Sequence, residues 1–328
     1  MAGRSSVPPS RGTFIVGVAL VAIAGVLVAF AFAKLQRHPD AGVLIYAGSG
    51  AIYERDLGTG RDTKVASIPR DTKVAEPSPD GRFVAYGNAQ GSLWMFDTKA
   101  KTRYQLAEAG TIPIGWSPDS KLVARELVGR SDVVLIDPNA GRTGLIEAPP
   151  ITLSLPVWIS SSRFAIGDLA DPNGSLLVDT QGSEQPVVHA SFGVPLAASP
   201  DGTHLLYERG HELREATVTP SGIEASRVLF EGDATVAATS PQGHVAFAAK
   251  DAAGRQGVWA LETGTSVRRV VDGAVDWLVF TRDGGSICYA THGVIYALTL
   301  DGRSKPKRLS RRGVDVLTLL SFRVVPAK

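Results

Sequence analysis

The chain has 328 residues, of which 44% are hydrophobic and 20% are charged, so it can bury a sizeable apolar core. Its 34 basic and 32 acidic residues nearly cancel, which argues against nucleic-acid binding, because that task needs a concentrated basic face. The single cysteine, Cys288, excludes an internal disulfide.

The chain begins with a tail, residues 1–12, followed by an apolar segment at 13–33 that contains no charged side chain. At about 1.5 Å per residue, a helix of this length matches the roughly 30 Å hydrocarbon core of a bilayer. We therefore predict a transmembrane helix or uncleaved signal anchor. A cleaved signal peptide is the alternative, because Ala31-Phe32-Ala33 resembles a cleavage site. Residues 34–42 then form a linker.

Basic residues flank the apolar segment on both sides, with Arg4 and Arg11 before it and Lys34 and Arg37 after it. The positive-inside rule then gives a slight preference for the N-terminus in the cytoplasm. The expected location is the cytoplasmic (inner) membrane, crossed once, with the large domain on the extracytoplasmic or periplasmic side.

A four-residue turn of the type Ser-Pro-Asp-Gly recurs along the rest of the chain. Copies stand at residues 78–81, 117–120, 199–202, 240–243 and 281–284, with a degraded copy at 160–163. Proline presets the first turn position, Asp suits the second, and Gly permits the left-handed geometry that follows. A period near 40 residues (39 to 43 between copies) with a turn and short strands is typical of a β-propeller with one blade per repeat.

A second landmark is an apolar strand that ends in a polar turn residue. Its seven copies lie at 52–56, 93–97, 133–137, 176–179, 216–219, 258–262 and 295–299. We name the four strands of a blade A to D from the axis outward, so that the first turn joins A to B and the second joins C to D.

The two landmarks differ by one copy, and this difference predicts where the ring closes. The first unit starts at a B strand, 43–47, and the chain carries an unpaired strand at 314–322. If 314–322 is the A strand of the first blade, the fold is an all-β, seven-bladed propeller over 43–325, with six or eight blades as alternatives.

Residues 116–119 and 199–207, which read WSPD and SPDGTHLLY, resemble the WD40-like repeats of TolB-type propellers. The resemblance covers about 43–325 and implies a protein-binding surface, often in the cell envelope. Similar blades form the lid of prolyl-oligopeptidase-type peptidases, but this sequence contains no Gly-x-Ser-x-Gly nucleophile elbow.

No catalytic residue, metal site or cofactor is predicted. His211-Glu212 lacks the second histidine of a zinc helix, and the loop 167–174 lacks the ligand pattern of a calcium site. Asn173 opens a glycosylation sequon that chance explains. Cys288 lies in an apolar strand and is interpreted as an inert buried thiol. A propeller enzyme (hydrolase or lyase) with its site at the channel mouth, or a small-ligand sensor, remains the alternative.

Two surface regions are candidate binding sites. A cationic stretch consists of Arg303, Lys305, Lys307, Arg308, Arg311 and Arg312. It is either a solvated outer strand or a patch for anionic lipid or an acidic partner, on the same side as the tether. On the opposite side, B–C and D–A loops present Asn88, Gln90, Arg130, Asp168, Asp171, Asn173, Arg255 and His292. The expected function is a non-catalytic scaffold subunit of a bacterial-type envelope or membrane complex; the oligomeric state stays open.

Overall fold

The computed structural model describes residues 42–325, except 89–90, 108–109, 127–132, 147–153, 169–170, 172, 182–186, 262–265, 302 and 312–321. The tail at 1–12 and the apolar segment at 13–33 lie outside the described residues, as does the linker except for Gly42. Regular structure in the described part is β-strand throughout, and none of it is a helix long and apolar enough to cross a membrane.

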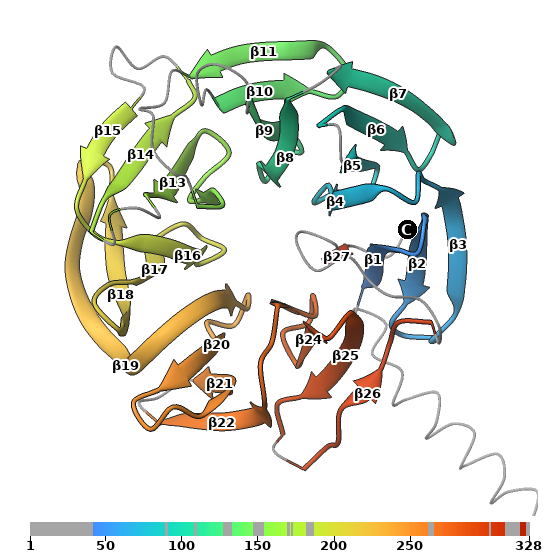
Figure 1. The fold of residues 1–328 in the computed structure, drawn as a ribbon. Helices are drawn as coiled ribbons and strands as arrows, with labels where there is room; N and C mark the ends of the chain where they lie inside the picture. The colour runs from blue at the N-terminus through green and yellow to red at the C-terminus, as the bar shows by residue number, and fades with distance from the viewer. Residues whose placement is uncertain are drawn as a thin grey trace, which may run out of the picture. The chain divides into compact units, whose positions relative to one another are not determined.

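The strands form antiparallel sheets arranged as a ring around an axis (Figure 1). The first sheet joins β27 (Phe322–Val325) to β1 (Val43–Gly48), β2 (Ala51–Asp56) and β3 (Asp62–Ser67). The next contains β4 (Thr72–Pro77), β5 (Phe83–Asn88), β6 (Leu93–Asp97) and β7 (Thr102–Ala107). Two more contain β8 (Thr111–Trp116), β9 (Leu122–Glu126), β10 (Val133–Asp137) and β11 (Gly141–Ile146), then β12 (Val157–Trp158), β13 (Arg163–Gly167), β14 (Ser175–Asp179) and β15 (Val187–Ala190).

The remaining strands form one large sheet and one of ordinary size. The large sheet contains β16 (Val194–Ala198), β17 (His204–Glu208), β18 (Glu212–Thr219), β19 (Gly222–Thr239), β20 (Val245–Asp251), β21 (Gln256–Leu261) and β22 (Val267–Asp272). The last sheet contains β23 (Trp277–Phe280), β24 (Ser286–Thr291), β25 (Val294–Thr299) and β26 (Lys307–Arg308). This architecture confirms the prediction of an all-β propeller.

The seven-stranded sheet arises from the length of β19. Residues 222–231 of this strand pair with β18, and residues 232–239 pair with β20. The change occurs at Gly232, whose φ of 149° falls in a region that favours glycine. One strand therefore serves as the outer strand of one four-strand group and as the inner strand of the next.

The ring is closed by the two ends of the described chain. β27 pairs antiparallel with β1, with Val43 opposite Val325 and Tyr46 opposite Phe322. This closing strand begins at the residue where the predicted strand 314–322 ends, and residues 312–321 lie outside the described part. Pairing of β1 on both sides leaves it no free edge.

The core lies between neighbouring sheets. Leu44 and Tyr46 of β1, for example, pack in one buried cluster with Cys288 and Ile295 of the last sheet. Similar clusters of Val, Leu, Ala and aromatic side chains fill the other interfaces. Strands such as β1 and β5 thus bury apolar residues on both faces, as the central strands of stacked sheets must.

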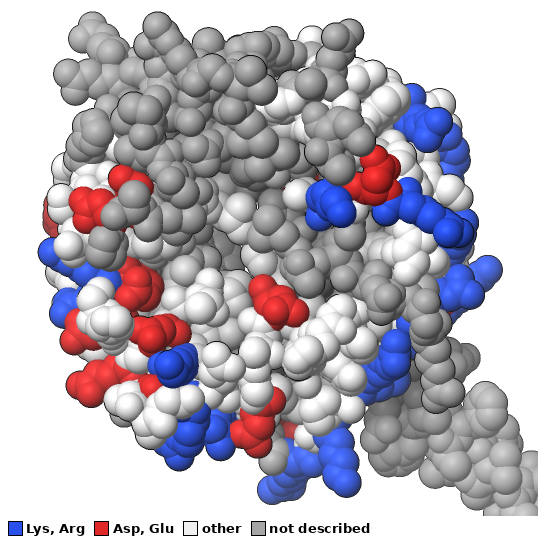
Figure 2. All heavy atoms as spheres, viewed as in Figure 1, with Lys and Arg blue, Asp and Glu red and all other residues white. Residues whose placement is uncertain are grey.

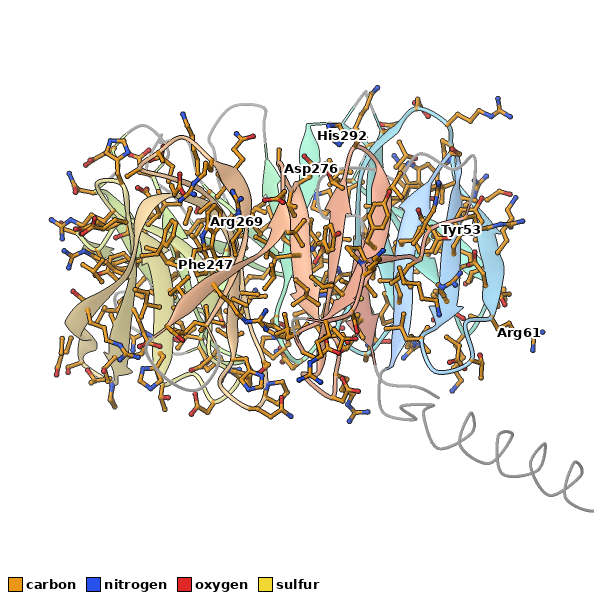
Figure 3. The ribbon with its side chains drawn as sticks, turned by 90° about the horizontal axis from the view of Figure 1, so that it is seen from below. Tyr53, Arg61, Phe247, Arg269, Asp276 and His292 are labelled. Atoms are coloured by element: carbon orange, nitrogen blue, oxygen red, sulfur yellow. The ribbon has the colours of Figure 1, made fainter. Side chains whose placement is uncertain are left out.

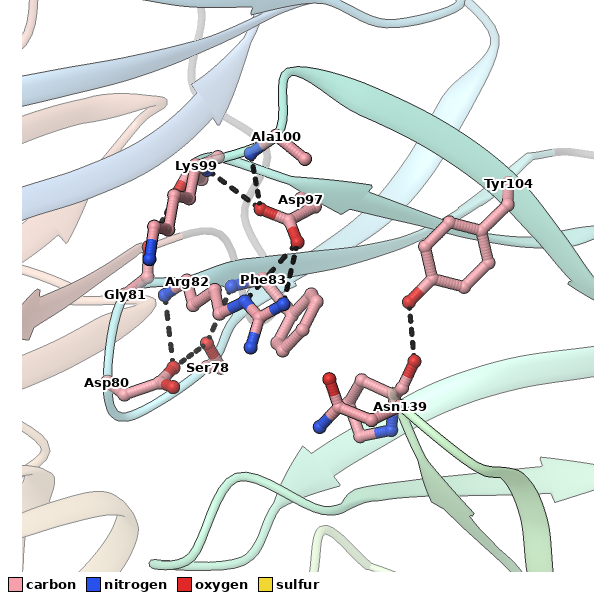
Figure 4. A network of polar contacts seen from close by, with 12 residues as sticks. Ser78, Asp80, Gly81, Arg82, Phe83, Asp97, Lys99, Ala100, Tyr104 and Asn139 are labelled. Atoms are coloured by element: carbon pink, nitrogen blue, oxygen red, sulfur yellow. Dashed lines mark hydrogen bonds and ion pairs between the residues drawn. The ribbon is translucent and has the colours of Figure 1, made fainter.

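The recurring turn is held by its own side chains (Figure 4). The Ser78 hydroxyl donates to Asp80 Oδ1 at 2.6 Å and accepts the backbone N–H of Phe83 at 2.9 Å. The same pair of contacts recurs around Ser117, Ser199 and Thr281. The repeated aspartates therefore fix a turn, as their identical positions in the repeats predicted.

Both turn families lie on one rim of the ring. Arg82, which follows a recurring turn, donates from Nη2 to the C–D turn residue Asp97 at 3.2 Å, and the Thr98 hydroxyl donates to the Gly81 carbonyl at 2.9 Å (Figure 4). We call this side the turn rim and the opposite side, which carries the β17–β18 and β24–β25 connections, the loop rim. Figure 3 shows His292 near the loop rim and Arg61 near the turn rim.

Candidate functional site

The predicted cationic stretch begins on the turn rim and continues along the outside of the ring. Arg303 and Lys305 are exposed in the β25–β26 connection, and Lys307 is exposed on β26. Arg308 donates to the Ser310 carbonyl at 3.3 Å and the Arg311 carbonyl at 3.2 Å.

Arg311 is part of the packing between the last and first sheets. Its guanidinium lies 5.5 Å from the centre of the Tyr53 ring, and its Nε is 4.0 Å from Asp62 Oδ2. Its backbone N–H also donates to the Tyr46 hydroxyl at 3.2 Å. These contacts give Arg311 a structural role in addition to its charge. Arg312 lies outside the described residues.

The predicted partner-face residues that the structure describes lie in connections of the loop rim, except Asn88, which is the last residue of β5. Asn173 Oδ1 accepts a hydrogen bond from Arg209 Nε at 3.0 Å, which links the β13–β14 and β17–β18 connections. Arg255 pairs with Asp251 at 2.7 Å, and His292 has a φ of 49°. Asn88 accepts the N–H of Ser92 at 2.8 Å. Asp168 and Asp171 lie in the β13–β14 connection, whereas Gln90 and Arg130 lie outside the described residues.

Charges of both signs gather over β17–β20 (Figure 2, lower left). A shallow pocket of about 500 Å³ there is lined by Glu212, Glu231, Asp233 and Lys250, among others. A hydrogen bond from His211 to Asp233 raises the pKa of the histidine. In the part of the chain that the structure describes, no group of three His, Cys, Asp or Glu side chains is arranged to hold a metal ion.

Residues on and next to the inner strands line an open axial cavity of about 450 Å³. It is lined by Glu76, Pro79, Gly115, Trp116, Pro118, Leu155, Pro156, Val157, Trp158, Leu196, Ala198, Ala237, Ala238, Trp277, Leu278, Val279 and Arg323. A second cavity of about 270 Å³ shares Leu155, Pro156, Val157, Leu196, Ala237 and Trp277 with the first and adds Ser154, Val194, Pro195, Thr235 and Val236. The walls are thus largely apolar and aromatic, as in small-molecule sites.

One ion pair interrupts this apolar lining. Glu76 on β4 accepts a hydrogen bond at Oε1 from Arg323 Nη2 on β27 across 2.7 Å. The Glu76 side chain is 3% exposed and that of Arg323 is 28% exposed. Burial raises the pKa of Glu76 to about 7, although the Arg323 charge opposes the shift. Its second oxygen, Oε2, is buried without a hydrogen-bond partner among the described residues.

Three tryptophans line the cavity, and they differ in whether the indole N–H has a hydrogen-bond acceptor. Trp116 donates its N–H to the Glu76 carbonyl at 2.8 Å, so this ring supports the strand that carries the carboxylate. The indole N–H groups of Trp158 and Trp277 are buried and have no acceptor in the described structure. Unpaired buried donors cost about 1–3 kcal/mol each, and a bound water or ligand is the usual explanation.

Glu76 and Arg323 were absent from the candidate residues predicted from the sequence. The sequence did contain a sign that Glu76 is unusual. Glu76 stands two residues before the first recurring turn, where a charged residue is an exception among the repeats. The same position in the other repeats holds Gly115, Trp158, Ala197, Ala238 and Val279, none of which is charged. A lone carboxylate among inner-strand residues indicates a position with a special role. No sequence pattern of this kind predicts that Glu76 contacts Arg323.

Cys288 lies in β24 and is fully buried, as predicted. Burial raises the pKa of its thiol to about 12, so the thiolate that reacts as a nucleophile is scarce at neutral pH. The predicted burial of this residue in the core is confirmed.

Comparison with known proteins places the fold. No family model matches the chain, and no curated protein matches its sequence. Among solved structures, it is similar to oligogalacturonate lyase in complex with manganese, with 16% identity and a TM-score of 0.61 over 80% of this chain and 87% of that one.

Two further structures are similar. The β-propeller domain of Myceliophteria thermophila Cps50 (Swd1) has 14% identity and a TM-score of 0.55 over 73% of this chain and 85% of that one. Dihydro-heme d1 dehydrogenase NirN in complex with DHE has 15% identity and a TM-score of 0.57 over 83% of this chain and 65% of that one. At these identities the likeness establishes a β-propeller fold and leaves the activity open, since one fold serves many functions.

Proposed function

We propose that this protein is a seven-bladed, non-catalytic β-propeller, tethered to the cytoplasmic membrane by residues 13–33, that binds a protein partner through its loop rim. Five four-stranded sheets, together with two four-strand groups that share β19 in the seven-stranded sheet, support this blade count. The resemblance of residues 116–119 and 199–207 to TolB-type repeats favours a periplasmic scaffold of an envelope complex.

The observation that carries the proposal is the position of Gly42, the last residue of the predicted linker. The Leu57 N–H in the β2–β3 turn donates to the Gly42 carbonyl at 3.1 Å, so Gly42 lies on the turn rim. A tether that precedes Gly42 would then bring the turn rim toward the bilayer, together with the exposed Arg303 and Lys305. Each such cation near an anionic surface contributes about 1 kcal/mol. The loop rim would face away and be free for a partner.

The test is affinity purification of the full chain from gently solubilised membranes. We expect a stoichiometric protein partner that is lost in the loop-rim variant Arg255→Glu and kept in the turn-rim control Arg61→Glu. Arg255 is exposed and pairs only with the neighbouring Asp251 among described residues, so the change leaves the core intact. Recovery of the wild type without a partner would count against a scaffold role.

Membrane orientation needs a separate measurement. Protease treatment of spheroplasts should digest the propeller, and mass spectrometry should find the N-terminus intact. Digestion only after lysis would place the domain in the cytoplasm, and a mature N-terminus near residue 34 would replace the anchor by a cleaved signal.

A propeller enzyme is the second candidate, because a carboxyl group whose pKa lies near 7, like that of Glu76, suits general acid–base catalysis. Against it, the charged side chains that line the described axial cavity are Glu76 and Arg323, and these bind each other. Because the fold is similar to that of oligogalacturonate lyase in complex with manganese, the assay measures cleavage of oligogalacturonate in the presence of Mn²⁺. We expect no turnover; turnover that disappears in Glu76→Gln would reject the non-catalytic proposal.

A further inference from the structure

Among the described side chains that line the axial cavity, Arg323 supplies partly exposed hydrogen-bond donors. Arg323 is partly exposed, and one of its N–H groups is used by Glu76; the others have no partner among the described residues. The indole N–H groups of Trp158 and Trp277 and the Glu76 Oε2 atom are buried and unpaired among the described residues, so the accessible polar group of the wall is the Arg323 guanidinium. The cavity therefore suits a ligand that brings hydrogen-bond acceptors.

The same cavity defines the rest of such a ligand. Its volume of about 450 Å³ lies in the usual range for small-molecule sites, about 300–1,000 Å³. Leucine, proline, valine and tryptophan side chains make up most of the wall, so the body of the ligand should be apolar. A guanidinium is the side chain best suited to bind a carboxylate with two parallel hydrogen bonds.

We propose that the axial cavity binds a small organic monocarboxylate with an apolar body, whose carboxylate pairs with Arg323 and whose body lies against Trp158 and Trp277. An amine of the same shape would meet the positive charge of Arg323, and an alcohol would offer that charge only a neutral acceptor. The proposal is independent of the membrane tether and of any protein partner.

Glu76 regulates such a site because it competes for the same guanidinium. Three elements meet at this group: β4 carries Glu76, β27 brings Arg323, and β8 brings the neutral Trp116, which binds the Glu76 backbone. Arg323 is the charged group that acts on the Glu76 carboxyl among the described residues. When Glu76 takes up a proton, Arg323 is released for the ligand. Binding should strengthen as the pH falls from 8 to 6, where an ordinary carboxylate ligand stays largely ionised.

The experiment is calorimetric titration of the full-length protein in lipid nanodiscs, with empty nanodiscs as the blank. The three ligands share one body: 3-phenylpropanoate, 3-phenylpropanol and 3-phenylpropylamine. We expect the carboxylate to bind at least tenfold more tightly than the other two. Equal affinity for the acid and the alcohol, or a preference for the amine, would overturn the proposal.

Variants assign the contact. Arg323→Met should weaken binding of 3-phenylpropanoate tenfold or more, whereas the control Arg61→Met, an exposed arginine on the turn rim, should bind like the wild type. Glu76→Gln should bind several-fold more tightly at pH 8 and lose the pH dependence. If Arg323→Met does not fold, Glu76→Gln and the ligand series still decide. Unchanged affinity in a folded Arg323→Met protein contradicts the assignment.

A carboxylate on an apolar body is also found at the C-terminus of a peptide. A parallel titration with Ala-Leu-Phe, with a free or an amidated C-terminus, distinguishes the two sources. Binding of the free peptide without binding of 3-phenylpropanoate would show that the site takes a polypeptide end and would overturn the small-acid proposal.

Discussion

Glu76 and Arg323, 247 residues apart in sequence, meet across 2.7 Å at the ring axis. Arg323 belongs to β27, the strand that closes the first sheet, and Glu76 belongs to the inner strand of the second. Their ion pair therefore joins the closing strand to a sheet with which β27 shares no backbone ladder. Because both side chains also line the axial cavity, ring closure and the chemistry of the cavity depend on the same contact.

Glu76 should make the stability of the protein depend on pH. Its pKa is about 7 in the folded state and near 4.5 when unfolded, so the folded state binds the proton more tightly. The resulting stabilisation is fully present below pH 4.5 and is lost as the pH rises through 7, by at most on the order of 3 kcal/mol. Glu76→Gln should remove this dependence. The measurement is the difference in unfolding free energy between wild type and variant at pH 5 and pH 8.

Glu224→Gln is the matched control for this experiment, because Glu224 is exposed on β19 and far from the axis in the fold. Its unfolding free energy should follow that of the wild type at both pH values. A constant difference between wild type and Glu76→Gln from pH 5 to 8 would show that the buried carboxyl keeps an ordinary pKa.

The closing strand should be essential for stability. Val324 of β27 stands opposite Leu44 of β1 and packs against the buried cluster of the first and last sheets. Val324→Asp places a carboxylate against this cluster, and we expect a loss of about 2–4 kcal/mol of unfolding free energy, with aggregation through the freed edge of β1. The control is Val228→Asp, since Val228 is 41% exposed on β19. Denaturant titration and light scattering report both effects; equal losses in the two variants would show that β27 contributes little.

The glycine of the recurring turn should be required for contact between sheets as well as for its backbone angle. Gly202 has a φ of 71°, and an added Cβ would lie 2.3 Å from the Ile159 carbonyl of the neighbouring sheet. Gly210 has a φ of 59° but open space around a Cβ. Both alanine variants carry the left-handed strain of about 1–2 kcal/mol. We expect Gly202→Ala to lower the free energy of unfolding by about 2 kcal/mol more than Gly210→Ala, as measured by thermal unfolding. Equal losses in the two variants would show that backbone strain alone accounts for the effect.

Cys288 should report on unfolding. Because the thiol is buried and its pKa is about 12, a thiol reagent at neutral pH should modify it only when the last sheet opens. The labelling rate should rise with denaturant in parallel with the loss of folded protein. Fast labelling of the native protein, at the rate of a free cysteine, would mean that β24 is accessible in solution.

The sequence predicted those parts of the fold that depend on local chemistry. The Ser-Pro-Asp-Gly turns are formed by hydrogen bonds within five residues, so each copy could be read without knowing its neighbours. The strands between them were visible as short apolar runs. The shared strand β19 was not predicted, because its sequence contains no turn signal that would show whether two strands or one bent strand connects the sheets.

The candidate site was less predictable. The cationic stretch was evident from composition, but the structure gives Arg311 a packing role against Tyr53 that sequence order does not reveal. The residues that line the axial cavity were not predicted, because its wall takes one to three residues from each inner strand, and these groups lie about 40 positions apart.

The sequence by itself therefore determined a repeated β-architecture with a closing strand near the C-terminus, since turns and strand patterns are set by neighbouring residues. The tertiary structure alone decided which residues meet at the axis. Closure of the ring brings Arg323 to Glu76 and removes the Glu76 carboxyl from bulk water, and this burial raises the pKa of Glu76. The indole N–H groups of Trp158 and Trp277 are likewise buried, without an acceptor among the described residues. Such properties depend on distance and desolvation, which no local pattern encodes.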